Sequence, residues 1–167
     1  MKTINTFINE KLKINKNTKL EDNDYYIDLG LSSGNLWATY NYNLKSNDKY
    51  GKLYTFKEAK KLDIILPSLK DFKELFDNCT HEWTIVNTLK GQLFTSKIND
   101  ESIFFPAEGC QADLSTYYRG SSGYYWTSSE SSSKDTLYYI SFNKFEIFPQ
   151  NINAYDKNKF SIRQIKK

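Results

Sequence analysis

Two stretches in the middle of the chain are predicted to form helices, one from the spacing of its apolar residues and one from a capping box. In "PSLKDFKELFDN", residues 67–78, the apolar side chains fall three or four positions apart, which places them on one face of a helix. Ser68 stands at the N-cap position, with Asp71 in the first turn. "TFKEAKKL" carries a capping box at Thr55 and Glu58, so we expect a helix of about two turns there.

Short runs of strand-forming residues lie before and after these helices. The runs are "YYIDLGL" and "NLWATYN" before them, and "EWTIVNT", "GQLFTSKI", "SIFFPA", "YYWTSS", "TLYYISFN", "FEIF" and "FSIRQI" after them. Turns are expected at "SSG" (32–34), at Leu89–Gly91 and at "NDE" (99–101). Two helices followed by many short strands indicate an α+β fold with antiparallel sheet.

The serine-rich stretch "SSGYYWTSSESSS", residues 121–133, divides into the end of a loop, a strand and a polar turn. Because strand side chains alternate between faces, Tyr125 is expected opposite Tyr124 and Trp126. Trp126 is the best core candidate of the three, and Tyr124 is expected at the rim.

The start of the chain differs in charge and pattern from the rest. Residues 1–20 carry five lysines and one glutamate, a net charge of +4 that leaves −1 for the remainder. The sequence therefore predicts an amphipathic arm and linker over 1–24 and a nearly neutral domain over 25–167. Residues 3–12 of the arm are predicted to form a short amphipathic helix with Thr3 as its N-cap. A helix this short needs a partner surface, either its own domain or another protein. Its docking residues are Ile4, Phe7, Ile8 and Leu12.

Composition narrows the classes of function. A chain of 167 residues that is 39% hydrophobic and 16% aromatic is typical of one folded unit. With only two arginines, and with the net positive charge concentrated in the arm, we expect no nucleic-acid partner. No apolar run has the length of a signal peptide or a membrane span, so neither is predicted. Cys79 and Cys110 are expected as separate buried thiols, although a single bridge stays open.

Enzyme motifs are missing from the sequence. The single histidine, His81, lacks the neighbouring ligands of a zinc site and any motif that would complete a nucleophile–base pair. Neither a P-loop nor a dinucleotide-binding glycine motif occurs. We therefore expect no catalytic residues, no metal and no cofactor.

Six stretches, in order, resemble the Fibrobacter succinogenes major paralogous domain family. They are "DLGLSSGNLWATYN", "YGKLYTFKEA", "LPSLKDFKEL", "SIFFPAEG", "GYYWTSS" and "FSIRQI", and the resemblance covers residues 26–165. The resemblance implies a C-type-lectin-like fold, in which two short helices and a twisted antiparallel sheet support irregular recognition loops. It implies a non-catalytic binding module. The chain lacks the tripeptides E-P-N, Q-P-D and W-N-D of calcium-dependent lectins, so calcium-dependent sugar binding is not implied.

The arm has a resemblance of its own. "INTFINEKLKINK", residues 4–16, is similar to the starts of proteins encoded by crAss-like phages of Bacteroidetes. This implies a phage protein of the virion, assembled in the host cytoplasm as a head or tail decoration, whose arm docks on a virion structural protein. A decoration protein with no receptor, a host-encoded adhesion domain and self-association stay open.

The recognition surface for a host glycan or surface protein is expected in two segments, "STYYRGSSGY" (115–124) and "PQNINAYDKN" (149–158). Tyrosine gives a large contact area at low entropic cost and ends in a hydroxyl, and glycines nearby favour a turn that exposes it. The alternative is that the first two tyrosines cover the edge of the core. The candidate ligand-binding residues are Tyr117, Tyr118, Arg119, Ser121, Tyr124, Asn151, Asn153 and Tyr155.

Overall fold

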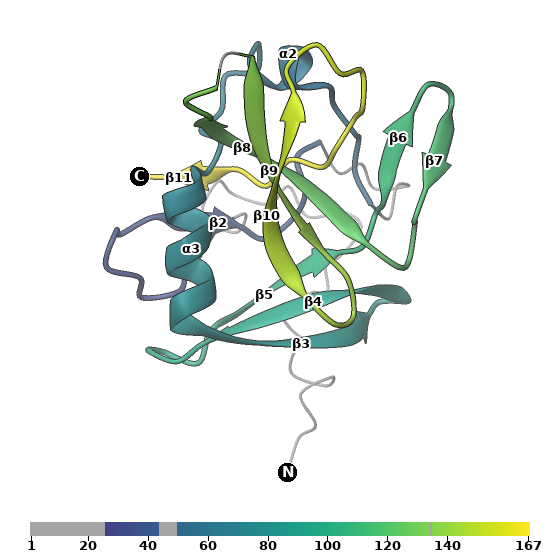
Figure 1. Cartoon of the computed structure of the whole chain (residues 1–167). Coiled ribbons are helices and arrows are strands. Elements are labelled where there is room, and N and C mark those ends of the chain that lie inside the picture. Colours follow the sequence, from purple (N-terminus) through teal and green to yellow (C-terminus); the bar gives the residue numbers. More distant parts are fainter. Residues whose placement is uncertain (1–25, 44–49, 134) are drawn as a thin grey trace.

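The structure is a computed structural model, and it describes residues 26–43, 50–133 and 135–167. Within these ranges the chain forms a mixed α+β fold, with two short helices and mostly antiparallel strands in four small sheets (Figure 1). This confirms the α+β class that the sequence predicted. The predicted arm lies outside the described residues, together with its docking residues Ile4, Phe7, Ile8 and Leu12. No helix in the described ranges is both long enough and apolar enough to cross a membrane.

The two ends of the described chain meet in one sheet. In this sheet β2 (Leu36–Ala38) lies between β1 (Tyr26–Asp28) and β11 (Ile165–Lys166). The first two strands are shorter than the runs that predicted them. After β1 the chain leaves the sheet, and Leu29 and Leu31 are buried in the core instead.

The helix α2 (Phe56–Ala59) begins where the capping box predicted it. The backbone N–H of Glu58 donates to Thr55 Oγ1 at 3.2 Å, and the Glu58 carboxylate accepts from the Thr55 N–H at 2.8 Å. The predicted length of two turns is wrong, because the helix has four residues. The N–H of Lys61 donates to the Glu58 carbonyl three positions back, which tightens the last turn and ends the helix.

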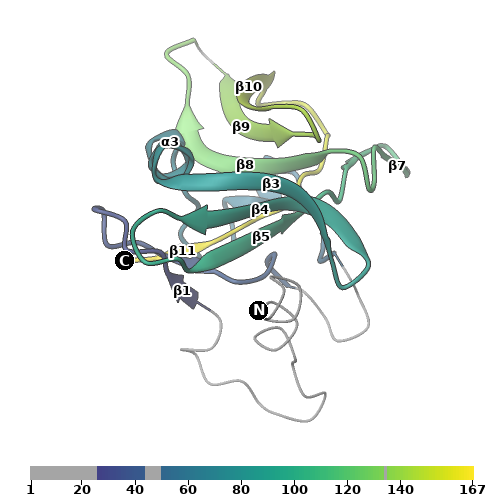
Figure 2. The same cartoon turned by 90° about the horizontal axis from the view of Figure 1, so that it is seen from below.

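The longer helix, α3 (Leu69–Asn78), matches the prediction at its start and along its apolar face. Ser68 caps it, and its hydroxyl accepts from the backbone N–H of Asp71. Phe72 and Leu75 are buried. The helix packs against β3, β4 and β8, at one end of two separate sheet layers (Figure 2).

Three strands after α3 form an antiparallel meander. They are β3 (Cys79–Val86), β4 (Leu89–Ser96) and β5 (Ser102–Pro106).

The turn between β3 and β4 lies at Asn87 and Thr88, both with positive φ, so the prediction of a turn at Leu89–Gly91 is wrong. Gly91 instead lies inside β4. A Cβ there would collide with the carbonyl oxygen of Phe105 in β5, so this glycine permits close strand contact rather than a turn.

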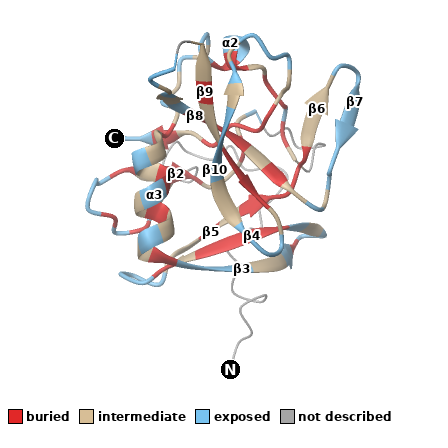
Figure 3. Ribbon diagram, viewed as in Figure 1, coloured by how far each residue is buried: buried red, intermediate tan, exposed pale blue. Residues whose placement is uncertain are grey.

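A second meander is covered on both of its faces. It consists of β8 (Gly123–Glu130), β9 (Thr136–Phe142) and β10 (Ile147–Asn153), with β10 at the edge and Pro149 within it. One face packs on a core cluster with Trp37, and the other on a cluster around Phe160. The buried residues of this meander lie in β8 and β9, whereas much of β10 is exposed (Figure 3).

The predicted alternation along β8 is confirmed. Tyr125 belongs to the Trp37 cluster, whereas Trp126 belongs to the Phe160 cluster and half-buried Tyr124 packs against it. Because both faces are covered, Tyr125 is buried as completely as Trp126.

The predicted recognition segments are partly strand. β6 (Cys110–Ala112) and β7 (Ser115–Tyr117) form a hairpin that projects from the body of the molecule (Figure 1). The expected loop at 115–124 therefore opens with β7 and ends in β8. The expected loop at 149–158 begins within β10, because residues up to Asn153 pair with β9.

The last segment of the chain carries a buried arginine. Arg163 is fully buried; its Nη1 donates to the Ala38 carbonyl at 3.0 Å and its Nη2 to the Phe104 carbonyl at 2.8 Å. Its guanidinium lies 4.5 Å from the centre of the Phe105 ring. Burial lowers the pKa of Arg163. One side chain thus connects β2, β5 and the C-terminal segment.

We predict that Arg163→Met lowers the free energy of unfolding by about 3 kcal/mol, because two buried carbonyls lose their donors. Urea denaturation measures this loss. The matched control is Lys73→Met on an exposed face of α3, which should change stability by no more than about 0.5 kcal/mol. A similar small change for both variants would contradict the assigned role of Arg163.

Candidate functional site

Four tyrosines form a continuous row from the projecting hairpin to the body of the protein. We call Tyr117, Tyr118, Tyr124 and Tyr139 the tyrosine row. Successive ring centroids lie 6.4, 6.2 and 6.2 Å apart. Tyr117 and Tyr118 are 48% and 61% exposed as whole residues, and Tyr124 and Tyr139 are half-buried. At the inner end of the row, the Tyr139 ring packs against the ring of buried Phe160, with 4.7 Å between the ring centroids. The row is therefore exposed at one end and anchored in the core at the other.

The turn after β7 sets the direction of the first two rings. Tyr118 has a φ of 60°, a left-handed conformation that is uncommon for a tyrosine. Its carbonyl accepts from the backbone N–H groups of Ser121 and Ser122 and from the Ser121 hydroxyl, at 2.9–3.0 Å. Ser121, a predicted ligand-binding residue, thus uses its hydroxyl to hold the turn.

The half-buried tyrosines of the row keep their protons at neutral pH. Burial is the main cause that raises the pKa of Tyr124 and of Tyr139, and Cys110 beside both raises them further. A protonated phenol both donates and accepts hydrogen bonds. Cys79 and Cys110 are both free thiols. The inner half of the row therefore offers neutral polar groups on an apolar surface.

Below the row, the hairpin joins the core at Glu108. This carboxylate is 1% exposed, and Arg119 Nη2 lies 4.0 Å from its Oε1. The Arg119 guanidinium also lies 5.0 Å from the centre of the Tyr50 ring. Arg119, predicted as a ligand contact, is thus held between a buried carboxylate and an aromatic ring.

A buried polar network lies behind the hairpin. The Tyr125 hydroxyl donates to the Pro106 carbonyl at 2.8 Å, and the Ser161 hydroxyl donates to Glu108 Oε2 at 3.2 Å. Burial raises the pKa of Tyr125 to about 12, and the charges of Arg163 and Glu108 act on it in opposite directions. The support of the row is therefore polar as well as aromatic.

The remaining predicted residues do not join the row. Asn151 pairs with Tyr138, and Asn153 pairs with Thr136, so both asparagines lie on the sheet face opposite Tyr139. The structure thus gathers five predicted residues at one site and separates these two from it. The gathered residues are Tyr117, Tyr118, Arg119, Ser121 and Tyr124.

Tyr155 lies in the loop after β10 and is 76% exposed. Its backbone N–H donates to Asn153 Oδ1 at 2.9 Å, so Asn153 shapes the start of this loop.

Sequence reasoning missed Tyr139. It belongs to the site because β9 pairs with β8 in the register that places Tyr139 opposite Trp126. Its β10 partner Gln150 is exposed on the same face and was also missed. A pattern of alternation identifies the strand, but the register between two strands leaves no local signal.

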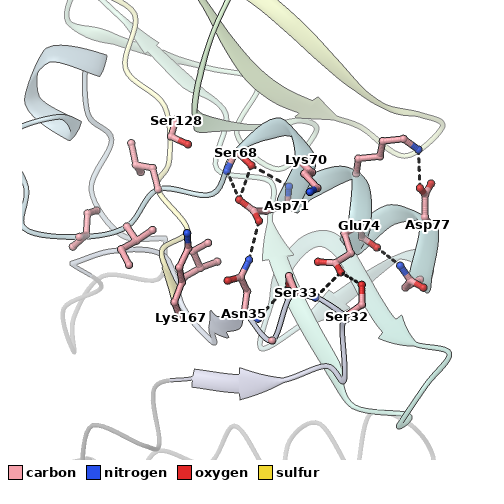
Figure 4. A pocket seen from close by; sticks show the side chains of 17 residues that line it. Ser32, Ser33, Asn35, Ser68, Lys70, Asp71, Glu74, Asp77, Ser128 and Lys167 are labelled. Atoms are coloured by element: carbon pink, nitrogen blue, oxygen red, sulfur yellow. Dashed lines mark hydrogen bonds and ion pairs between the residues drawn. The ribbon is translucent and has the colours of Figure 1, made fainter.

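A second surface feature is a wide groove between α3 and the turn that follows β1 (Figure 4). Its volume is about 1070 Å³. Asp71 Oδ1 accepts from Asn35 Nδ2 at 2.8 Å, and Glu74 Oε1 accepts from the Ser32 hydroxyl at 2.7 Å. These bonds fasten the turn to the helix.

The carboxylate of Glu74 accepts hydrogen bonds from the turn and is not available to a ligand. Burial raises its pKa, but hydrogen bonds from Ser33 and Ser32 outweigh that effect, so the pKa is lower than usual. Glu74 is therefore ionised and already bonded at neutral pH. The groove serves as a structural joint, and the tyrosine row is the better candidate for recognition.

A family model described as "Domain of unknown function (DUF8237)" matches residues 78–165. This range contains the whole tyrosine row as well as Glu108 and Arg119. No curated protein and no solved structure matches the chain.

We predict that the folded protein loses stability as the pH rises from about 10 to 12. The pKa of Tyr125 is about 12 when folded and about 10 when unfolded, so the folded state holds this proton more tightly. Its stabilising contribution is complete below pH 10 and falls above it. Urea denaturation at pH 9 and pH 11 measures the change, and Tyr125→Phe should make the fall shallower. Equal pH dependence in both proteins would contradict the prediction.

Proposed function

The chain belongs to the family described as "Domain of unknown function (DUF8237)", and we propose that it is a non-catalytic binding module. Its recognition surface is the tyrosine row. The observation that carries the proposal is the arrangement itself: exposed Tyr117 and Tyr118 are continuous with rings that are fixed in the core. Rigid aromatic side chains give contact area with little loss of entropy on binding.

The proposal includes a C-type-lectin-like fold. Two short helices and several antiparallel sheets support it, as does the long excursion of the chain between β5 and β8. That excursion carries the hairpin and the start of the row. A rigid frame with a projecting segment is a common arrangement for recognition, because loops vary while the frame holds them.

The proposed setting is a phage virion. The protein docks on a virion structural protein through its basic, amphipathic arm, and the tyrosine row meets a glycan or protein on the host surface. The pattern of residues 3–12 and the resemblance at 4–16 support the docking. The aromatic, weakly charged character of the row supports the recognition of a surface ligand.

We predict that Tyr118→Ala weakens binding of the labelled protein to intact host cells by about tenfold or more. The Tyr118 side chain is exposed, and in the tyrosine row it lies between Tyr117 and Tyr124. Flow cytometry measures the binding, and a glycan array separates sugars from proteins as ligands. The control is Ile98→Ala. Ile98 is 55% exposed in the turn between β4 and β5, across the molecule from the hairpin, and its loss should leave binding unchanged (Figure 1).

Two results would overturn this reading of the row. One is equal binding by Tyr118→Ala and the unmodified protein. The other is an unmodified protein that binds neither cells nor glycans, while its deletion makes particles less stable. The second result would identify a structural decoration protein without a receptor.

We predict that deletion of residues 1–20 abolishes incorporation into phage particles and leaves the thermal midpoint of the domain unchanged. The arm supplies the apolar docking face, whereas every element of the described core lies after it. Purified particles are probed with an antibody against the domain, and calorimetry checks the fold. Normal incorporation of the shortened chain would refute the docking role.

A further inference from the structure

We propose that Glu108 is the positioning residue of the tyrosine row, because its buried carboxylate fixes the β6–β7 hairpin through Arg119. The consequence for ligand binding rests on the proposed function. The positioning itself is a property of the protein alone and is measurable without a ligand.

Glu108 lies where separate segments of the chain converge. Its Oε2 accepts from the Ser161 hydroxyl at 3.2 Å and lies 3.5 Å from Asn41 Nδ2. Both of these partners are buried and neutral, and they hold the carboxylate in place within the core. The carboxylate is therefore fixed to the core before the hairpin is considered.

A buried carboxylate is costly unless a positive charge lies near it. Arg119 supplies that charge from the hairpin side, at 4.0 Å, with its own side chain half exposed. Arg163, the other arginine of the sequence, is bonded instead to the carbonyls of Ala38 and Phe104. Arg119 thus links the fixed carboxylate to the hairpin side of the contact.

Arg119 directly follows the two exposed tyrosines, so its position constrains theirs. The Tyr118 backbone is in a left-handed conformation and turns sharply into Gly120. A main chain held in this way directs the side chains of Tyr117 and Tyr118 outward together. If Arg119 moved, the same turn would carry both rings with it.

Backbone contacts cross the same junction. Gly120 N–H donates to the Ala107 carbonyl at 2.7 Å, and Gly109 N–H donates to the Ser122 carbonyl at 2.8 Å. A Cβ at Gly109 would collide with the carbonyl oxygen of Tyr117, so the two segments lie against each other with no room for a side chain. The amides of Gly109 and Gly120 therefore report directly on whether the junction is closed.

Hydrogen exchange of the full chain tests the proposal. Arg119→Gln should speed exchange of the Gly109 and Gly120 amides by about tenfold, because the buried carboxylate loses the positive charge of Arg119 on the hairpin side and the junction opens locally. Amides in the centre of β4, at Leu93 and Phe94, should stay within about twofold of the unmodified protein. Glu108→Gln combined with Arg119→Gln should restore part of the protection, since the buried group that faced Arg119 is then neutral as well.

The control is Lys73→Gln, which removes the same charge from an exposed ion pair with Asp77 and should leave the junction amides unchanged. Unchanged exchange at Gly109 and Gly120 in Arg119→Gln would overturn the proposal. So would equal acceleration in β4, because that result indicates a loss of global stability rather than of positioning.

Cell binding separates this inference from the proposed function. If the row recognises a host surface, Arg119→Gln should also weaken binding of labelled protein to intact host cells. An unmodified protein that binds no cells would refute the proposed function, while faster exchange confined to the junction would still establish the positioning role of Glu108.

Discussion

The positive charge of Arg163 in the centre of the protein holds together strands that no single sheet contains. Its donors reach a carbonyl at the end of β2 and another in β5, and its guanidinium lies over the Phe105 ring. Within the described residues the sheets of this fold are small, and only isolated single-residue bridges run between their strands and the neighbouring segments. A guanidinium with five donors in a fixed plane can bridge such strands where an apolar side chain cannot. Arg163 therefore adds a polar link between β2 and β5 to the apolar packing of the core.

A series of buried polar and charged side chains continues from Arg163 to the surface of the protein. The charges of Arg163 and Glu108 both act on the pKa of Tyr125. Glu108 in turn faces Arg119 at the base of the hairpin. Apolar packing surrounds this series of polar groups on both sides of the β8–β9–β10 sheet. Buried polar groups of this kind favour one arrangement over its close alternatives, because each misplaced member is left without a partner. An exposed hairpin of three-residue strands gains a defined position in this way.

Local signals predicted much of the fold, and long-range contacts explain the errors. The capping box at Thr55, the N-cap at Ser68 and the apolar stripe located both described helices, and runs of strand-forming residues identified most strands. The turn at Asn87 and Thr88 was missed because Gly91 looked like a turn residue, when its role is to let β5 approach. For the site, the tyrosines of one continuous segment were found together. Tyr139 was missed because only the pairing between strands decides which side chains meet.

The edge strand β10 has a further consequence through Pro149. Proline has no backbone N–H and is tolerated in sheets mainly at edges, with that position facing solvent. The unpaired edge of β10 therefore lacks one of the backbone N–H donors that a strand from another molecule would need in order to pair with it. An uninterrupted edge invites stacking between molecules when many copies are crowded together. Pro149 makes the exposed edge of the sheet a poor template for pairing with a strand of another molecule. It therefore disfavours edge-to-edge association of the protein at high local concentration.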